Sequence, residues 1–234
     1  MAQPTPSESG LMGMSSFANL GRLASKGNKL ATLISSFAFA FSAVSFYETV
    51  LKQPKISIHV PAVLHYGRDG GGDTEVFAIP LTVTNDGAQS GTVLGVELAI
   101  ENPKAVGEAA KSKTFYSAYM GEHPKDANAT NRAFAPITVA GRASFSDTIR
   151  FYPQGNVFPH LITETGTFKM KLTVKTAAPS EPSIIDRLFR AGDPQPLTFE
   201  RTLPYMSDQH LKFRRGTIAM HSDDWKPTLS SSSK

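Results

Sequence analysis

The feature that most constrains this chain is an uncharged apolar run, Leu30 to Tyr47. It contains no Pro, no Gly and no charged residue, and it is bounded by Lys29 and Glu48. Eighteen residues in a helix extend about 27 Å, close to the roughly 30 Å hydrocarbon core of a bilayer. We therefore expect residues 30–51 to form one transmembrane helix that anchors a single-pass membrane protein.

Two alternatives for this run stay open. A secretory signal peptide could be cleaved at the small-residue site Ala38-Phe39-Ala40, which would release a soluble product. A buried helix of a soluble protein is the second alternative, but its solvent-facing side should carry charges, and this run has none. The length and the lack of charge favour the membrane span.

Small residues share one narrow stripe of the expected helix. At about 100° per residue, the stripe contains Ala31, Ser35, Ala38, Ser42 and Ser45. Small side chains let two helices approach closely in lipid, and serine hydroxyls can bond across the contact. We expect a helix-packing face for self-association or for association with another membrane helix. The alternative is that the lipid merely tolerates these serines.

The charges that flank the run predict its orientation. Three positive residues precede it and two follow it: Arg22, Lys26 and Lys29, then Lys52 and Lys55. The positive-inside rule then places the N-terminus in the cytoplasm and the folded domain in the periplasm or the extracellular space, behind a signal-anchor. Residues 1–29 would be a leader, either a flexible tail or one that contains an interfacial helix.

After the anchor, the periodicity changes to the alternation of β-strands. Gln53-Pro54 breaks the helix, and Lys55 to Val60 alternates between polar and apolar residues. The clearest strands are 75–85 and 92–101, joined by a turn. Further strands are expected at 114–119, 134–139, 143–152, 166–176, 197–203 and 216–221, with 134–139 and 143–152 forming a hairpin. We interpret residues 55–222 as one β-domain, followed by a disordered tail over 223–234.

The first two of these strands carry a resemblance to a known family. The segment LTVTNDG, Leu81 to Gly87, is followed after a small-residue turn by TVLGVELAI, Thr92 to Ile100. Over about residues 56–101 this pattern resembles bacterial immunoglobulin-like domains of the cell-adhesion-related type, in which a strand ends in this motif and its hairpin partner follows. The resemblance implies an all-β, immunoglobulin-like antiparallel β-sandwich with a binding or spacer role and no catalytic residues.

The residue types of strand 75–85 and of the turn after it predict specific roles for several positions. Asn85 and Gly87 should supply the left-handed backbone that a tight turn requires. Pro80 lacks an amide hydrogen, which predicts an edge strand or a bulge. Phe77, Ile79, Leu81 and Val83 alternate with less apolar residues and should face the core.

One segment interrupts the strand pattern. Residues 177–196 are Pro-rich at both ends, and Ser183 can cap a helix over 183–190 with one apolar face. Such a helix would plug the end of the sandwich. The alternative is an exposed apolar patch for a partner or for the lipid surface.

The composition and the motifs argue against most catalytic classes. Cys is absent, so disulfides and thiolate metal sites are excluded. The net charge of +4 is scattered and predicts no nucleic-acid binding. The six histidines show no metal-ligand spacing, and the chain has neither a phosphate-binding glycine loop nor a nucleophile elbow. We expect no enzyme activity, no cofactor and no metal.

These observations predict a non-enzymatic single-pass membrane protein that presents an immunoglobulin-like domain outside the cytoplasm, for protein–protein contact or envelope assembly. The alternative is an exported soluble module for carbohydrate or another ligand, released by signal-peptide cleavage. Carbohydrate modules usually bind through exposed aromatic side chains. The sequence has one tryptophan, Trp225. Neither it nor the tyrosines show a spacing that predicts such a platform: Tyr116, Tyr119, Tyr152 and Tyr205.

Overall fold

A computed structural model of the 234-residue chain divides into two compact units, Met1–Val50 and Leu51–Lys234. The structure describes residues 16–69, 73–105, 107, 111–121, 132–177, 194–207 and 216–224. The helix expected at 183–190 and the residues of the expected tail from 225 onward lie outside these described residues.

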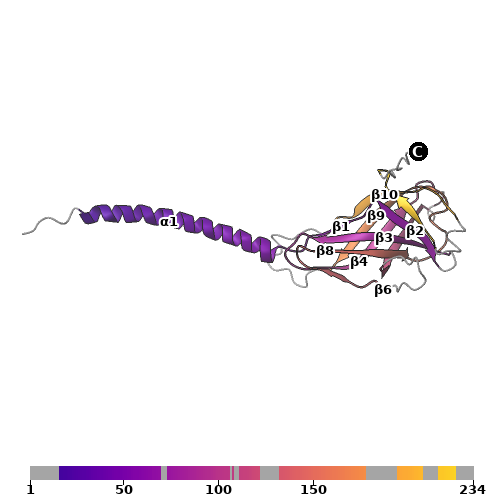
Figure 1. Cartoon of the computed structure of the whole chain (residues 1–234), viewed down its shortest axis with the longest axis horizontal. Helices are drawn as coiled ribbons and strands as arrows, with labels where there is room; N and C mark the ends of the chain where they lie inside the picture. Colours follow the sequence, from indigo (N-terminus) through magenta and orange to yellow (C-terminus); the bar gives the residue numbers. More distant parts are fainter. Residues whose placement is uncertain are drawn as a thin grey trace, which may run out of the picture. The chain divides into compact units, whose positions relative to one another are not determined.

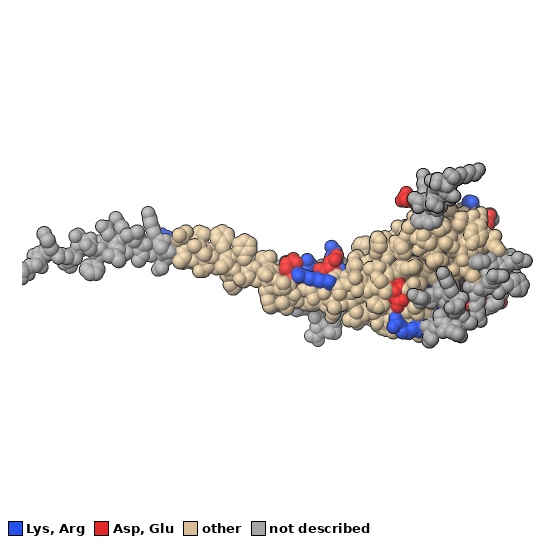
Figure 2. Space-filling model, in the orientation of Figure 1, with Lys and Arg blue, Asp and Glu red and all other residues tan. Residues whose placement is uncertain are grey.

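The first unit contains one long helix, α1 (Ser16–Phe46), which continues into a π-helical turn, η1 (Tyr47–Leu51) (Figure 1). The helical backbone therefore begins before the apolar run. By length and composition, Lys29–Leu51 is long and apolar enough to cross a membrane. Leu30 to Tyr47 contains no charged residue, and Figure 2 shows a long stretch of the helix surface in tan.

Hydroxyl groups inside this segment bond to the helix's own backbone. Ser36 Oγ donates to the carbonyl of Thr32 at 2.9 Å, and Thr49 Oγ1 donates to the carbonyl of Ser45 at 2.7 Å. Such i to i−4 bonds satisfy a hydroxyl without any partner outside the helix. The hydroxyls of Ser36 and Thr49 therefore lower the compatibility of Lys29–Leu51 with lipid less than unbonded hydroxyls would.

The second unit is built from antiparallel strands. The long ones are β2 (Val63–Asp69), β3 (Thr74–Asn85), β4 (Gly91–Glu101), β5 (Ser112–Met120), β8 (Ser144–Pro153), β9 (Gly166–Thr176), β10 (Leu197–Leu203) and β11 (Thr217–His221). Within the described residues, these eight strands form a closed barrel in the order β5, β8, β3, β2, β11, β10, β9, β4 and back to β5 (Figure 1). Three short strands extend it: β1 (Ile56–His59) on β3, β6 (Arg132–Ala133) on β5 and β7 (Ile137–Val139) on β4.

The expected immunoglobulin-like sandwich is wrong, although the all-β class is right. A sandwich keeps two separate sheets, whereas β4 pairs with β5 from Glu97↔Tyr116 to Glu101↔Ser112 and closes one continuous sheet. The expected hairpin between 75–85 and 92–101 does not form either. Instead β3 pairs with β8, β2 and β1, and β4 pairs with β9, β5 and β7. A sandwich and a barrel both bury one face of each strand, so alternation alone cannot distinguish them.

Two further strand predictions differ from the structure. The expected hairpin of 134–139 with 143–152 is absent, because β7 pairs with β4 while β8 pairs with β3 and β5. Strand β2 is not among the strands expected from the sequence. Leu64 and Tyr66 nevertheless alternate with polar or small neighbours and are fully buried, which is the signal that was overlooked.

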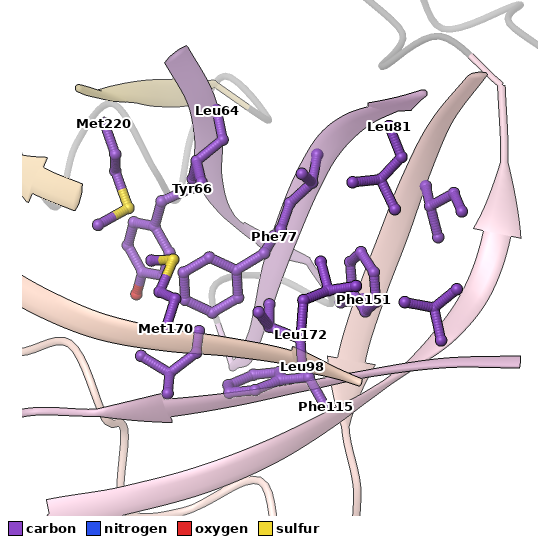
Figure 3. Packing of buried hydrophobic residues seen from close by; sticks show 14 of the residues in the cluster. Leu64, Tyr66, Phe77, Leu81, Leu98, Phe115, Phe151, Met170, Leu172 and Met220 are labelled. Atoms are coloured by element: carbon purple, nitrogen blue, oxygen red, sulfur yellow. The ribbon is translucent and has the colours of Figure 1, made fainter. Parts of the chain in front are cut away.

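The barrel interior is filled by side chains. Phe77, Ile79, Leu81 and Val83 are buried, as their alternation predicts. The Phe77 ring lies 5.3 Å from the Tyr66 ring and meets the Phe115 ring edge-on at 4.9 Å, centroid to centroid. Figure 3 shows these rings packed with Leu98, Met170 and Leu172 from the strands opposite. An eight-stranded barrel is just wide enough for side chains to fill it completely.

Pro80 does not mark an edge strand. It lies within β3, opposite Thr148 of β8. On the other side of β3, the pairing with β2 ends at Ala78, and the pairing with β1 starts only at Thr82. The Asn85 amide donates toward the β8 side, to Ala143. Because amides alternate in direction along a strand, position 80 faces the interval between β2 and β1, where no ladder bond is needed.

Gly87 is required for a close approach rather than for a left-handed backbone. Neither Asn85 nor Gly87 has a positive φ; the left-handed residue of this region is Arg142, at φ 57°. A Cβ on Gly87 would lie 2.1 Å from the Gln53 carbonyl oxygen and 2.6 Å from Pro54 Cα. Both atoms belong to the backbone of the segment 53–54. Relieving the overlap would therefore require a backbone shift, which costs more free energy than moving a flexible side chain.

We expect Gly87→Ala to lower the free energy of unfolding by about 1–3 kcal/mol or more, because the added methyl overlaps backbone atoms. Gly95→Ala is the matched control. Its Cβ would meet nothing within 4 Å, so this change should be neutral or stabilise by up to about 1 kcal/mol. Thermal unfolding of both full-length variants in detergent tests the difference, and equal melting temperatures would contradict the close packing of Gly87.

Candidate functional site

The structure places the five residues of the predicted helix-packing face on one unbroken helix. All five are exposed on α1: Ala31, Ser35, Ala38, Ser42 and Ser45. The large apolar side chains beside them are also exposed, Phe39 by 77% and Phe41 by 74%. Continuous helical spacing keeps the small residues on one stripe. Their role in packing remains a prediction.

One end of the barrel is closed around a buried carboxylate, Glu75. Its side chain is fully buried, at the start of β3, and it accepts hydrogen bonds from the amides of Leu161 and Ile162, each at 2.8 Å. The hydroxyl of Tyr66 donates to Glu75 Oε1 at 3.2 Å, and Lys113 Nζ lies 3.7 Å from Oε2. Each of these four groups is a hydrogen-bond donor or a cation and complements the acceptor oxygens of the carboxylate.

Further side chains fasten the same loop to the barrel wall. Lys113 Nζ donates to the carbonyls of Val157 and Pro159, at 2.6 and 3.0 Å. Arg68 Nη2 donates to the carbonyl of Ile162 at 3.0 Å, and Asn102 Nδ2 donates to the carbonyl of Leu161 at 3.1 Å. The loop 157–162 thereby covers this end of the barrel.

The chemistry of this cluster is structural. Burial and the charge of Glu75 raise the pKa of the Tyr66 hydroxyl well above its usual range, so Tyr66 stays protonated and keeps donating. Both carboxylate oxygens of Glu75 are engaged, and the residue has no exposed surface for a substrate. Glu75 closes the barrel and is poorly placed for catalysis.

The other end of the barrel is closed around a buried amide, Asn85. Its Oδ1 accepts from the amides of Lys55 and Gly87, at 3.1 and 3.0 Å. Its Nδ2 donates to the carbonyls of Gln89, Val139 and Ala140, at 2.8, 3.2 and 3.2 Å. The segment that follows the helix is fixed here as well, since the Lys52 carbonyl accepts from the amides of residues 88 and 89.

Three tyrosines meet on the outer wall of the barrel, and sequence reasoning missed this cluster. Tyr116 and Tyr152 are opposite each other on β5 and β8, and the Tyr119 and Tyr152 rings meet edge-on at 5.5 Å. The register of β5 against β8 shifts between Ser117 and Tyr119. This bulge puts Tyr116 and Tyr119 on the same face despite their odd spacing. Tyr205, by contrast, lies on the segment after β10.

A metal site finds no support in the part of the chain that the structure describes. Within it, no three His, Cys, Asp or Glu side chains converge. His160, for example, bonds through Nε2 to the carbonyl of Asp73 at 2.9 Å. The candidate sites are therefore the small-residue face of α1 and the tyrosine cluster, Tyr116, Tyr119 and Tyr152.

Comparisons with known proteins add little to this description. No protein-family model matches the chain, and no curated protein matches it. Among solved structures, the chain is similar to a Bordetella pertussis protein described as "Putative ApaA Protein". That similarity covers 74% of this chain and 98% of the other, with 11% sequence identity and a TM-score of 0.27. A similarity at this TM-score supports no argument about function.

We expect Glu75→Gln to lower the free energy of unfolding by about 3 kcal/mol, because an amide nitrogen would face backbone donors and Lys113 would lose its buried counter-charge. Glu97→Gln is the matched control. Glu97 makes a shorter ion pair, 3.0 Å from Lys175 Nζ, but the Lys175 side chain is 66% exposed. Solvent weakens that pair, so its loss should cost below about 1 kcal/mol.

Hydrogen exchange of the same two variants locates the effect. Glu75→Gln should speed amide exchange at Leu161 and Ile162, whose amides bond to this carboxylate. Unchanged exchange at both residues, or an equal loss of stability in Glu97→Gln, would contradict the assignment of Glu75 as the residue that holds this loop.

Proposed function

We propose that this chain is a non-enzymatic, single-pass membrane protein whose helix Lys29–Leu51 holds the β-barrel domain at a membrane surface for protein contact or envelope assembly. The observation that carries the proposal is the exposure of this helix. None of the span is buried within the structure, and its large apolar side chains are more than half exposed as far as Phe46. An apolar surface of this extent favours a lipid or protein environment over water.

The proposed orientation keeps the N-terminus in the cytoplasm and the barrel in the periplasm or the extracellular space. It is supported by the three positive residues that precede the span, Arg22, Lys26 and Lys29, against Lys52 and Lys55 after it. The barrel side begins at Leu51, and Lys52 and Lys55 are fixed to the barrel by their own backbone bonds. In the proposed orientation, these two lysines belong to the barrel domain and count on its side of the membrane.

The exported soluble module remains the second candidate function. Cleavage after Ala40 would leave Phe41 and the rest of the apolar run at the new N-terminus of the soluble product. An exposed Phe-rich terminus of this kind is a poor start for a soluble protein. The observation that favours ligand binding by such a module is the tyrosine cluster, Tyr116, Tyr119 and Tyr152.

Reporter fusions test the proposed topology. An alkaline phosphatase fused after Ser233 in a bacterial host should be active, because the C-terminal domain would lie outside the cytoplasm. A fluorescent protein that folds only in the cytoplasm should stay dark at the same position. The reverse pattern would overturn the orientation. A shortened protein that is released from membranes by alkaline carbonate would favour the exported module.

The proposed packing face makes a separate prediction. Ala38→Leu and Ser42→Leu should each weaken association through the membrane helix several-fold, because the larger side chain separates the two backbones. Phe41→Leu, on the large-residue band, is the matched control and should change little. An in-membrane reporter assay on residues 29–52 compares them. Equal signals from all three would reject self-association through this stripe.

A further inference from the structure

The three tyrosines lie close together on the outer wall of the barrel. Tyr116 and Tyr119 are 49% and 38% exposed, and Tyr152 is half-buried beside both of them. Cross-strand partners such as Tyr116 and Tyr152 hold their Cβ atoms about 5 Å apart, and the Tyr119 ring touches the Tyr152 ring at 5.5 Å. Tyr119 and Tyr152 are therefore in ring contact, and Tyr116 lies beside Tyr152 on the neighbouring strand.

The central ring of this surface is held in place. The Tyr152 hydroxyl donates to Asp69 Oδ2, at the end of β2, at 2.5 Å. Burial and this bond raise the pKa of Tyr152 well above its usual range, so the hydroxyl keeps its hydrogen. A ring fixed before a ligand arrives loses little conformational entropy on binding.

The surroundings of the rings present little net charge. Glu97, opposite Tyr116, is paired with Lys175 at 3.0 Å, and Asp69 is engaged by the Tyr152 hydroxyl. Arg150, opposite Tyr119, is only 3% exposed and does not present its charge to solvent. A neutral ligand fits this surface better than an ion does.

The curvature of the wall further narrows the ligand class. The outer face of a closed barrel is convex, so three rings on it form a platform and cannot enclose a cation as an aromatic cage does. The residues paired with the two exposed tyrosines on the neighbouring strands are polar, charged or small. Examples are Glu97, opposite Tyr116, and Ala133, opposite Tyr119. A flat ligand with an apolar C–H face and a hydroxyl rim satisfies both features.

We infer that Tyr116, Tyr119 and Tyr152 form a saccharide-binding platform, on which the C–H face of a neutral glycan stacks against the exposed rings. Sugar hydroxyls at the rim would bond to the tyrosine hydroxyls and to neighbouring polar groups. This inference does not depend on the membrane topology proposed above, because the platform is built entirely from strands β5 and β8 and from the end of β2.

Saturation-transfer NMR on the full-length protein tests the platform. The protein is kept in a zwitterionic detergent without sugar headgroups, because glycoside detergents would compete. Cellohexaose, chitohexaose and maltohexaose serve as probes, at up to about 10 mM. At least one should receive saturation. Tyr116→Ala and Tyr119→Ala should each weaken that binding about five- to tenfold, since a stacked ring is lost.

Two control sets make the result decisive. Tyr116→Phe and Tyr119→Phe keep the stacking ring and should stay within about threefold of the wild type. Tyr205→Ala removes a tyrosine that is 50% exposed outside the cluster, and it should leave binding unchanged. All variants should keep the wild-type melting temperature, which separates lost binding from lost folding.

Several outcomes would overturn the platform. The first is that none of the three probes receives saturation. The second is that Tyr205→Ala weakens saccharide binding as much as Tyr116→Ala or Tyr119→Ala does. The third is that the Phe variants weaken binding as much as the Ala variants do. Self-association that depends on Tyr116 and Tyr119 and occurs without any saccharide binding would likewise reject it, and would assign the surface to protein contact.

Discussion

The barrel depends on the inward-facing row of strand β3. Six alternate positions from Glu75 to Asn85 point into the barrel; the four central ones are apolar and buried, and the two ends are polar and buried. A closed barrel has no edge strands, but its two ends still expose backbone groups of the loops that cross them. Buried backbone polar groups need partners. Glu75 and Asn85 supply those partners, one at each end of the same strand.

The two ends require different chemistry, and the residues match it. Glu75 faces donors only: two amides, a hydroxyl and an ammonium group. Asn85 faces two amides through its oxygen and three carbonyls through its nitrogen. A carboxylate at position 85 would put an oxygen against three carbonyl oxygens, and an amide at position 75 would put a nitrogen against donors. Neither residue could replace the other.

The Asn85 end also holds the segment that precedes the first strand. The residues between the helix and the first strand, Lys52 to Lys55, are bonded to the loop 86–89 and to Asn85 itself. They form part of the barrel structure, and Gly87 leaves just enough room for them.

The sequence by itself determined the elements that depend on local pattern. The apolar run from Leu30 predicted a helix long enough to span a bilayer. The alternation in residues 75–85 predicted the buried face of β3, because periodicity follows from backbone geometry alone. Strand pairing was decided only by the tertiary structure. The β4–β5 pairing that closes the barrel joins residues whose alternation would be the same in a sandwich.

The tertiary structure also decided the roles of single residues that the sequence left ambiguous. Asn85 and Gly87 are typical turn residues, yet they act through a buried side chain and through a close backbone approach. Tyr116, Tyr119 and Tyr152 have no common spacing, and a bulge together with cross-strand pairing brings them onto one surface. Contacts between strands far apart in the chain carry no local signal, so only the folded barrel could reveal these roles.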